Sequence, residues 1–191
     1  NNPRDAFGVA QCYLGQSINT DSVEDWDKAI EALKKQNHLV SSYVMDEVFN
    51  KMENGEAALA PYYAGDFLTM YDVNPDLAFV YPKEGVNFFV DAMCVPKNAE
   101  NKEAAELYIN FMLEEEIAVA NANYICYATP HSLVLESDDY DLKGEPVLYP
   151  DPQNTPRTEM LENLDYKTQN YMNMLWNELK IEGNSNIDAY I

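Results

Sequence analysis

One aspartate lies in the middle of an apolar stretch near the centre of the chain. Residues 87–95 read NFFVDAMCV, and Asp91 is the only charged residue among them. In an extended strand, side chains alternate, which places Phe89, Asp91 and Met93 on one face. An ionised carboxylate in such a run is costly unless a cation or hydrogen-bond donors satisfy it. Asp91 is therefore either paired with a cationic ligand beside the ring of Phe89, or held at a strand end by backbone N–H groups.

The sequence offers no clear set of catalytic residues. The histidines, His38 and His131, are far apart, and no nucleophile motif accompanies them. Acid–base catalysis needs converging groups with matched pKa values, and the sequence offers no such set. We therefore expect no enzyme activity and no cofactor, and we interpret His131 as a loop residue.

An acidic loop over residues 137–150 partly matches a calcium-binding EF-hand pattern. Asp139 and Asp141 occupy its positions 1 and 3. Lys143 then falls at position 5 and Pro150 at position 12, where the pattern requires oxygen ligands. The sequence therefore predicts no metal site in this loop.

The three cysteines, Cys12, Cys94 and Cys126, are odd in number and widely spaced. This pattern indicates neither a disulfide framework nor a zinc site. We expect all three to be small buried apolar residues.

The net charge excludes one class of partner. The chain has 33 acidic and 12 basic residues among 191, which gives a formal charge of -21. Such a protein repels nucleic acid and attracts cations, although most of the charge is expected to be on a solvated surface.

The composition is that of a folded domain. At 47% hydrophobic and 12% aromatic residues, the chain can bury a sizeable core. The sequence contains no run of about 18 apolar residues, so it predicts no membrane span.

Helix signals are clear at several places. Asn2 precedes Pro3, and Gly15 follows an apolar stripe, so the sequence predicts a helix over residues 3–15. Residues 20–36 predict a second helix with Trp26 in the core. Further helices are predicted over residues 46–53, 66–72, 101–113, 114–123 and 165–182, whereas residues 184–191 lack clear periodicity and are expected to be peripheral.

Short apolar runs between these helices predict strands over residues 39–44, 57–64, 77–81 and 87–95. The alternation of helices and strands predicts an α/β fold with a mostly parallel sheet. Tyr63 stands at the carboxyl end of the second run, where open α/β sheets bind ligands. Its ring is therefore either a core aromatic or a face that holds a cation.

The central part of the chain resembles a known family. Residues 82–113 read PKEGVNFFVDAMCVPKNAENKEAAELYINFML. The order and spacing are similar to a segment of the spermidine/putrescine-binding proteins of bacterial ABC importers, in which W-P-K-E-G precedes a strand with aromatic-x-Asp and a helix with I-N-F. The likeness extends in weaker form from Asn2 to about Lys180 and corresponds to the carboxy-terminal half of that family.

The resemblance implies a periplasmic-binding-protein-like fold of the two-lobed type II, with helices flanking a mostly parallel sheet. In this fold the ligand sits between lobes that close by a hinge. The chain would contain mainly one lobe. Residues 1–86 would form an α/β segment of the second lobe, and residues 87–191 the strand that returns through the hinge and the carboxy-terminal helices. The missing amino-terminal lobe of the same protein would then be a partner.

The resemblance also implies ligand-binding residues. The family's strand aromatic and its amine-pairing aspartate correspond to Phe89 and Asp91, and its ligand-contacting tryptophan corresponds to Tyr63. Two acidic residues of the family's first helix correspond to Asn2 and Asp5.

Asp5 keeps the charge at this helix, whereas the neutral Asn2 favours a ligand with fewer charges. From the residues alone, the two read equally well as a helix cap and a carboxylate in the first turn. A polar contact before the family's last helix corresponds to Glu162.

The implied function is the capture of spermidine or putrescine for an ABC importer, with its permease subunits as further partners. The implied location is extracytoplasmic, in the periplasm or at the outer face of the cell membrane, either lipid-anchored or fused to a permease. The alternative is the same fold binding a different cationic or small organic solute.

Overall fold

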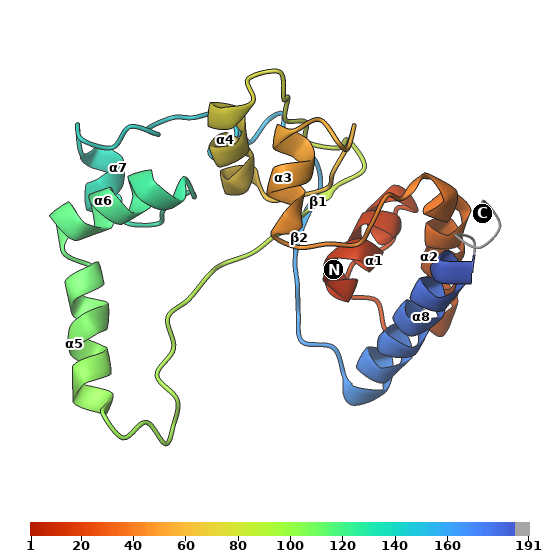
Figure 1. Cartoon of the computed structure of the whole chain (residues 1–191). Coiled ribbons are helices and arrows are strands. Elements are labelled where there is room, and N and C mark those ends of the chain that lie inside the picture. The colour runs from red at the N-terminus through yellow and green to blue at the C-terminus, as the bar shows by residue number, and fades with distance from the viewer. Residues whose placement is uncertain (186–191) are drawn as a thin grey trace.

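The structure, a computed structural model, describes the backbone of residues 1–185 and the side chains of residues 1–181. The expectation for residues 186–191 lies outside this range. Figure 1 shows one group of helices from the beginning and end of the chain and a second group over residues 102–136, with the helices of residues 47–73 and a small sheet between them. The elements are α1 (Pro3–Tyr13), α2 (Val23–Gln36), η1 (Asn37–Leu39), α3 (Glu47–Glu53), α4 (Ala64–Val73), β1 (Val86–Phe88), α5 (Lys102–Met112), α6 (Glu115–Ile125), α7 (Ser132–Glu136), β2 (Thr158–Met160) and α8 (Tyr166–Ser185).

Helix α1 begins where the capping residues predict. The Asn2 side chain accepts a hydrogen bond from the Arg4 backbone N–H at 3.0 Å, and Pro3 occupies the first helical position. Beyond the last turn, Gly15 has a φ of +70°, a backbone conformation that glycine adopts without a steric penalty. Local chemistry therefore sets both ends of this helix.

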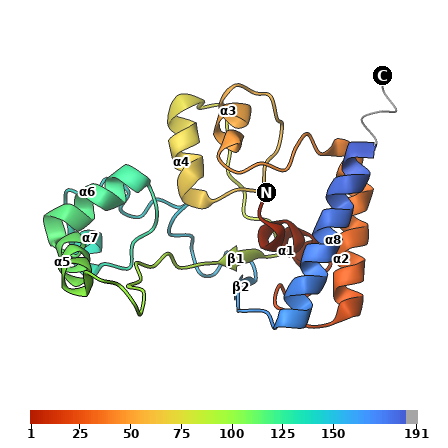
Figure 2. The same cartoon turned by 60° about the horizontal axis from the view of Figure 1, so that its bottom comes forward.

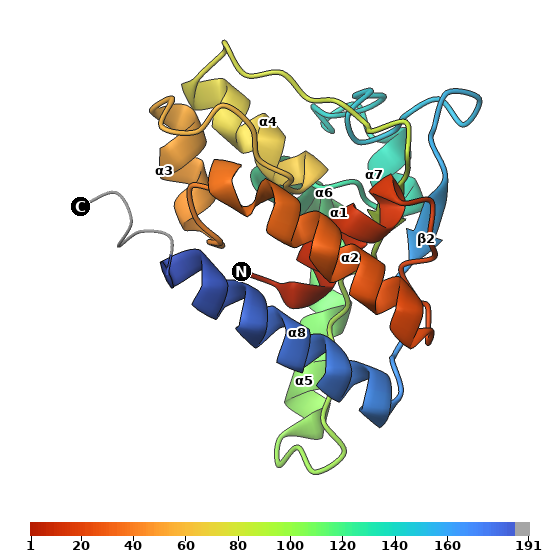
Figure 3. The same cartoon turned by 90° about the vertical axis from the view of Figure 1, so that its right-hand side faces the viewer.

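The main core lies between α1, α2 and α8. Phe7 and Trp26 are almost wholly buried, and their rings meet edge to face at 5.2 Å between centroids. Trp176 and Leu179 of α8 close the other side of this core. Figure 3 shows α2 and α8 running side by side, although they are far apart in the sequence. The prediction that Trp26 is a core residue is confirmed.

The sheet has two strands in the described part of the chain. Strands β1 and β2 pair in parallel, with Val86 opposite Thr158 and Phe88 opposite Met160. Gly85 precedes β1 and lies close to Arg157, which precedes β2, and it has a φ of +137°. A β-carbon at position 85 would lie 3.1 Å from the Arg157 carbonyl oxygen, so only glycine fits the approach to β2 without strain.

Most of the predicted strands do not form a hydrogen-bonded ladder. Residues 41–43, 58–62, 78–81 and 90–95 make no backbone–backbone hydrogen bonds with other described residues. The prediction of strands over residues 39–44, 57–64 and 77–81 is therefore wrong for this chain, and the strand predicted over residues 87–95 is reduced to β1. A strand needs a partner at each paired edge, and apolar composition alone does not provide one.

Helices α5, α6 and α7 form the second group. Ala118, Val119 and Ala122 of α6 pack against Val134 of α7 and Tyr140 to make a small separate core. Helix α5 buries no residue within the described chain and extends away from the rest (Figures 1 and 2). Helix α7 and β2 were not predicted, because both are short and carry little periodicity.

The cysteines do not all behave as predicted. Cys12 is buried, whereas Cys94 is exposed on an extended segment and Cys126 is only partly buried. The prediction of three buried cysteines is therefore wrong for Cys94 and Cys126. Cys126 has a φ of +59°, so its position at the end of α6 reflects a chain reversal and not core packing.

None of the helices in the described part of the chain is both long enough and apolar enough to cross a membrane.

The core between α1, α2 and α8 gives a stability prediction. Leu179 has no exposed surface, so Leu179→Ala should lower the free energy of unfolding by about 2 to 5 kcal/mol, as truncations in a packed core do. On the same helix, Met174 is 52% exposed, and Met174→Ala serves as the matched control with an expected change below about 0.5 kcal/mol. Urea denaturation monitored by tryptophan fluorescence measures both. Equal effects of the two changes would contradict the packing of α8 against α1 and α2.

Candidate functional site

Three aromatic rings form a continuous row next to the start of α4. The ring centroids of Tyr63 and Phe89 are 5.4 Å apart, and those of Phe89 and Tyr127 are 6.3 Å apart. We call Tyr63, Phe89 and Tyr127 the aromatic row. Tyr62 flanks it, with its ring centroid 4.9 Å from that of Tyr63. The sequence analysis singled out Tyr63 and Phe89, and the structure brings these two into contact.

Asp5 lies at the Tyr63 end of the aromatic row. Its Oδ2 atom accepts a hydrogen bond from the Tyr63 hydroxyl at 2.8 Å and another from the Asn2 side-chain amide at 2.7 Å. The two residues predicted at the first helix, Asn2 and Asp5, are thus joined to Tyr63. Asn2 also caps α1, which confirms the interpretation as a helix cap, whereas its contact with a ligand stays a prediction.

The ionisation of Tyr63 reflects this arrangement. Burial, and then the hydrogen bond to the Asp5 carboxylate, raise the pKa of Tyr63 to about 12. The hydroxyl therefore remains protonated at neutral pH and continues to donate to Asp5. This donation fixes one carboxylate oxygen at the end of the aromatic row.

Asp66 lies at the Tyr127 end of the aromatic row. The Tyr127 hydroxyl donates a hydrogen bond to Asp66 Oδ1 at 3.1 Å. Burial raises the pKa of Asp66, and the nearby charges of Asp46 and Asp91 raise it further against the opposing effect of the Tyr127 hydroxyl. Several carboxylates therefore gather at this end, and a cation would relieve their repulsion.

The sequence analysis missed Asp66. The local signal was weak: Asp66 follows Tyr63 by three residues, but Tyr63 precedes the helix in an extended conformation, so the two do not share a helix face. The helix start was also predicted at residue 66, whereas α4 already begins at Ala64. The role of Tyr127 had no comparable signal, because its partner Asp66 is 61 residues away in sequence.

A glycine and a chain reversal bring Tyr127 onto α4. A β-carbon at Gly65 would lie 2.4 Å from the Tyr127 ring and 2.8 Å from the Cys126 carbonyl oxygen. Only glycine therefore allows this ring to lie against the first turn of α4. The left-handed backbone of Cys126 ends α6 and turns the chain toward this contact.

Asp91 is exposed beyond the end of β1. None of the described residues donates a hydrogen bond to its carboxylate or forms an ion pair with it, so the alternative of a strand-end aspartate held by backbone N–H groups is not what the described chain shows. Its charge raises the pKa of both Asp66 and Tyr127, which places it near that end of the aromatic row. The predicted pairing of Asp91 with a cationic ligand stays a prediction.

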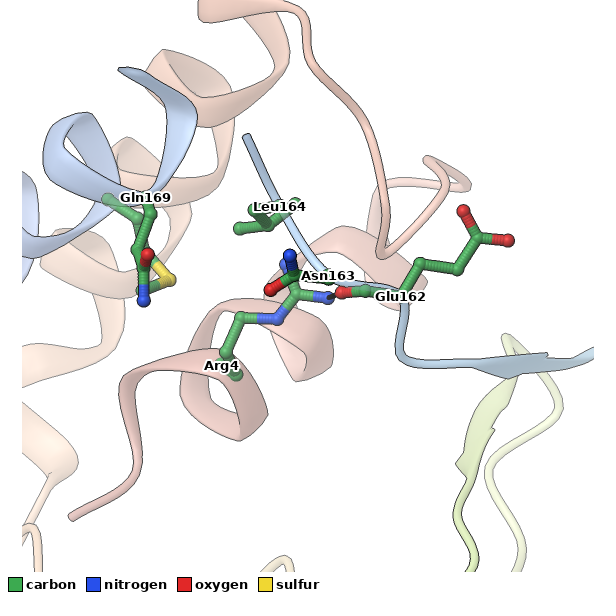
Figure 4. A pocket seen from close by; sticks show the side chains of 6 residues that line it. Arg4, Glu162, Asn163, Leu164 and Gln169 are labelled. Carbon is green, nitrogen blue, oxygen red and sulfur yellow. Dashed lines mark hydrogen bonds between the residues drawn. The ribbon is translucent and has the colours of Figure 1, made fainter. Parts of the chain in front are cut away.

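Glu162 lies apart from the aromatic row. Its backbone carbonyl accepts a hydrogen bond from Arg4 Nη2 at 3.3 Å, and its backbone N–H donates to the Asn19 side chain at 2.8 Å. Arg4 and Glu162 line a small cavity of about 120 Å³. Figure 4 shows them with Leu164 and Gln169, and the Glu162 carboxylate is turned away from Arg4. None of the described contacts joins the Glu162 side chain to the aromatic row, so its predicted role in binding stays a prediction.

His131 belongs to the helical group and not to the site. It precedes α7, and its Nε2 atom lies 3.0 Å from the Leu113 carbonyl oxygen. Within the described residues, no group of three or more histidine, cysteine or acidic side chains is placed to hold a metal ion.

The geometry combines negative charge with aromatic faces. Carboxylates lie at both ends of the row, Asp5 at one end and Asp66 at the other, and both accept hydrogen bonds from tyrosine hydroxyls. Aromatic faces attract ammonium groups, and their apolar surface also accommodates methylene chains. The arrangement is suited to a linear organic cation.

Comparisons with known proteins give a consistent picture. Residues 1–153 match the family described as bacterial extracellular solute-binding protein. The chain is 33% identical over 156 residues to the spermidine/putrescine-binding periplasmic protein of Salmonella typhimurium, covering 82% of this chain and 45% of that protein. It is 26% identical over 188 residues to the putrescine/cadaverine-binding protein of Pseudomonas aeruginosa, covering 94% of this chain and 52% of that protein.

A solved structure has the same fold. The protein from Listeria monocytogenes that carries the provisional name spermidine/putrescine ABC transporter superposes with a TM-score of 0.86 at 31% identity, covering 94% of this chain and 56% of that chain. This match confirms the predicted fold class and the resemblance to the polyamine-binding family. The chain spans about half the length of the relatives that it matches.

The hydrogen bond between Tyr63 and Asp5 can be tested by removing one oxygen atom. Tyr63→Phe keeps the ring in the aromatic row and should lower the free energy of unfolding by about 1 to 2 kcal/mol, since a hydrogen bond to a charged group is lost from a half-buried position. Tyr62→Phe is the matched control, because the Tyr62 hydroxyl has no hydrogen bond among the described contacts. Chemical denaturation of the three proteins measures the difference. Equal stability of Tyr63→Phe and wild type would contradict this contact.

Proposed function

Because the chain belongs to the bacterial extracellular solute-binding proteins, we propose that it binds a linear polyamine, spermidine or putrescine, for an ABC importer. One observation carries this proposal: the aromatic row has carboxylates at both of its ends. The names of the relatives from Salmonella typhimurium and Pseudomonas aeruginosa support the same ligand class.

Each residue has a distinct proposed role. Asp5 receives one terminal ammonium, with Asn2 and Tyr63 holding its carboxylate in place. Tyr63 and Phe89 line one side of the methylene chain and provide cation–π attraction, worth about 0.5 to 2 kcal/mol per contact depending on desolvation. Asp91 then pairs with another ammonium.

Asp66 joins Asp91 at that end of the aromatic row. Burial and the neighbouring carboxylates already disfavour its charge in the empty site, so an ammonium restores favourable pairing. A ligand of about ten heavy atoms held in this way reaches roughly micromolar affinity or better.

We propose three partners or surroundings for this chain: a second lobe, an extracytoplasmic location and permease subunits. An amino-terminal lobe would complete the ligand cleft, cover the exposed apolar side chains of α5 and pair with the extended segments that lack partners. The natural location is extracytoplasmic, with permease subunits as the docking partners. The domain division at residue 86 belongs to this proposal, since β1 begins there and continues into the long extended segment toward α5.

Solute binding without catalysis fits the chemistry of the site. The two carboxylates that the structure places at the aromatic row, Asp5 and Asp66, both accept hydrogen bonds from tyrosines whose pKa is raised. Such tyrosines hold their protons at neutral pH and therefore act as hydrogen-bond donors that orient the carboxylates. We propose that the protein binds its ligand and leaves it unchanged.

Calorimetric titration with spermidine and putrescine tests the ligand class. The titration uses the polypeptide that carries both lobes, with this chain alone run in parallel. Asp91→Asn should weaken binding at least tenfold, about 1.4 kcal/mol, because the ion pair with an ammonium is lost. Asp138→Asn makes the same charge change at another exposed aspartate, which has no described contact with the aromatic row, and should leave affinity unchanged.

Absence of heat and of a thermal shift with both amines in the two-lobed protein would refute the polyamine assignment. The same variants would then be titrated with other cationic or small organic solutes, which tests the alternative ligand class. Equal weakening by Asp91→Asn and Asp138→Asn would show a general charge effect and no ion pair.

The raised pKa of Asp66 predicts how polyamine binding depends on pH. Only the ionised carboxylate attracts an ammonium, so binding near the raised pKa releases a proton, and affinity falls as the pH drops through that value toward the ordinary 3.8. For the stability of the empty protein, the pH dependence has the opposite direction.

Because the pKa of Asp66 is raised in the folded state, ionisation of this carboxyl lowers the stability as the pH rises above 3.8. Asp66→Asn should therefore not lower the melting temperature at neutral pH.

Titration in buffers with different ionisation enthalpies measures the released protons. Asp66→Asn should reduce the proton release and weaken binding at neutral pH. Unchanged proton release together with unchanged affinity would remove Asp66 from the binding site.

A further inference from the structure

Asn87 lies in the middle of β1, on the strand face that points toward α1. It stands opposite Glu159 in the parallel register with β2, so its backbone position is fixed by the sheet. Its side-chain amide lies 3.4 Å from Asp5 Oδ1. Alternation along the chain puts Asn87 on the same side as Phe89, whose ring contacts Tyr63. Asn87 is thus a polar neighbour of the site, and the resemblance to the family assigned it no role.

The Asp5 carboxylate is surrounded by neutral donors. Oδ2 accepts short hydrogen bonds from Asn2 and Tyr63, at 2.7 and 2.8 Å, whereas Oδ1 has only the long contact to Asn87. A carboxylate has about four acceptor positions, so Oδ1 is the oxygen that remains open to a ligand. Among the described contacts, no cationic group donates a hydrogen bond to either oxygen.

The nearby charged groups face elsewhere. Arg4 directs its guanidinium to the Asn19 side chain and the Glu162 carbonyl. Glu159, opposite Asn87, accepts hydrogen bonds from the Ser17 hydroxyl and the Ile18 N–H and forms an ion pair with Arg157 at 3.4 Å. Arg4 still lies near enough to Asp5 for the two charges to attract each other. Among the described contacts, Asp5 is the carboxylate that accepts a hydrogen bond at the Tyr63 end of the aromatic row, which we call the α1 end.

Amide chemistry makes Asn87 suitable for a contact with the ligand. The two ends of an amide exchange places by rotation, so Asn87 can donate to Asp5 in the empty site and offer its oxygen to an ammonium in the filled site. It adds a hydrogen-bond acceptor without adding a charge. Asn2 has the same property on the other side of Asp5.

We propose that Asn87, together with Asn2, is a specificity-determining residue that limits the α1 end of the site to one negative charge and so selects linear diamines over triamines. The inference rests on the proposed polyamine function. A diamine places one ammonium at Asp5 and the other near Asp66 and Asp91. A triamine brings an additional positive charge into the row. The carboxylates that could balance this charge lie at the Tyr127 end only, since Asn2 and Asn87 beside Asp5 are neutral.

The test changes the charge at position 87 without changing the size of the side chain. Asn87→Asp should raise the ratio of spermidine affinity to putrescine affinity at least tenfold in the two-lobed protein, as measured by calorimetric titration. Asn87→Gln keeps a neutral amide and should retain the wild-type ratio to within about twofold. Asn98→Asp makes the same charge change at an exposed position outside the site and should also retain the ratio.

A second variant protects the test against misfolding. Asn2→Asp adds the charge on the opposite side of Asp5, and aspartate caps a helix as well as asparagine does, so α1 should remain intact. It should shift the ratio in the same direction as Asn87→Asp. Circular dichroism and the melting temperature of each variant confirm that it is folded.

Two results would overturn the inference, and they are distinguishable from a failure of the proposed function. If wild type binds putrescine but the ratio in both Asn87→Asp and Asn2→Asp stays within twofold of wild type, the specificity role is refuted and the function stands. The same holds if Asn98→Asp shifts the ratio equally. If wild type binds neither amine, the proposed function falls and this inference falls with it.

Discussion

The position of the first turn of α1 is fixed by aromatic packing in the main core. Phe7 is wholly buried, and its ring lies 5.2 Å from that of Trp26 and 6.4 Å from that of Trp176. Asp5 is only two residues away, so the core that holds Phe7 also holds the carboxylate at the end of the aromatic row. Because Trp176 comes from α8, near the end of the described chain, long-range burial determines the location of a charged group near its beginning.

The site is built to keep negative charge in partly buried surroundings. An ionised carboxylate that loses water is stable only with hydrogen-bond donors or a counter-charge. Asp5 has three neutral donors and is well satisfied, whereas Asp66 has the Tyr127 hydroxyl and repels Asp46 and Asp91. The two ends of the aromatic row are therefore electrostatically different, and a linear cation would meet one ordered carboxylate and one crowded group. The overall charge of -21 raises the local concentration of such cations.

The unpaired segments explain why the structure looks open. Backbone N–H and carbonyl groups need partners, and residues 58–62 and 90–95 have none among the described residues. Apolar side chains such as Phe88, Val90 and Tyr108 are more than half exposed. A chain that spans about half the length of its relatives while reproducing their fold at a TM-score of 0.86 is expected to leave such surfaces uncovered.

Sequence alone determined the elements whose signals are local. The Asn2–Pro3 cap and Gly15 bounded α1, the apolar spacing around Trp26 identified α2, and the run from residue 82 to residue 113 identified the family. The pairing of strands was not determined, because hydrogen-bonded partners are chosen by tertiary contacts, and three of the predicted strands remain extended without a partner. The resemblance had assigned Asp5, Tyr63 and Phe89 to one ligand site, but only the tertiary structure showed their contacts with one another and with Asn87, and placed Tyr127 against Asp66. The hydrogen bonds that join these residues cross 58 to 82 residues of sequence. Short-range capping and periodicity can be read residue by residue, whereas the assembly of a ligand site depends on which surfaces the core buries.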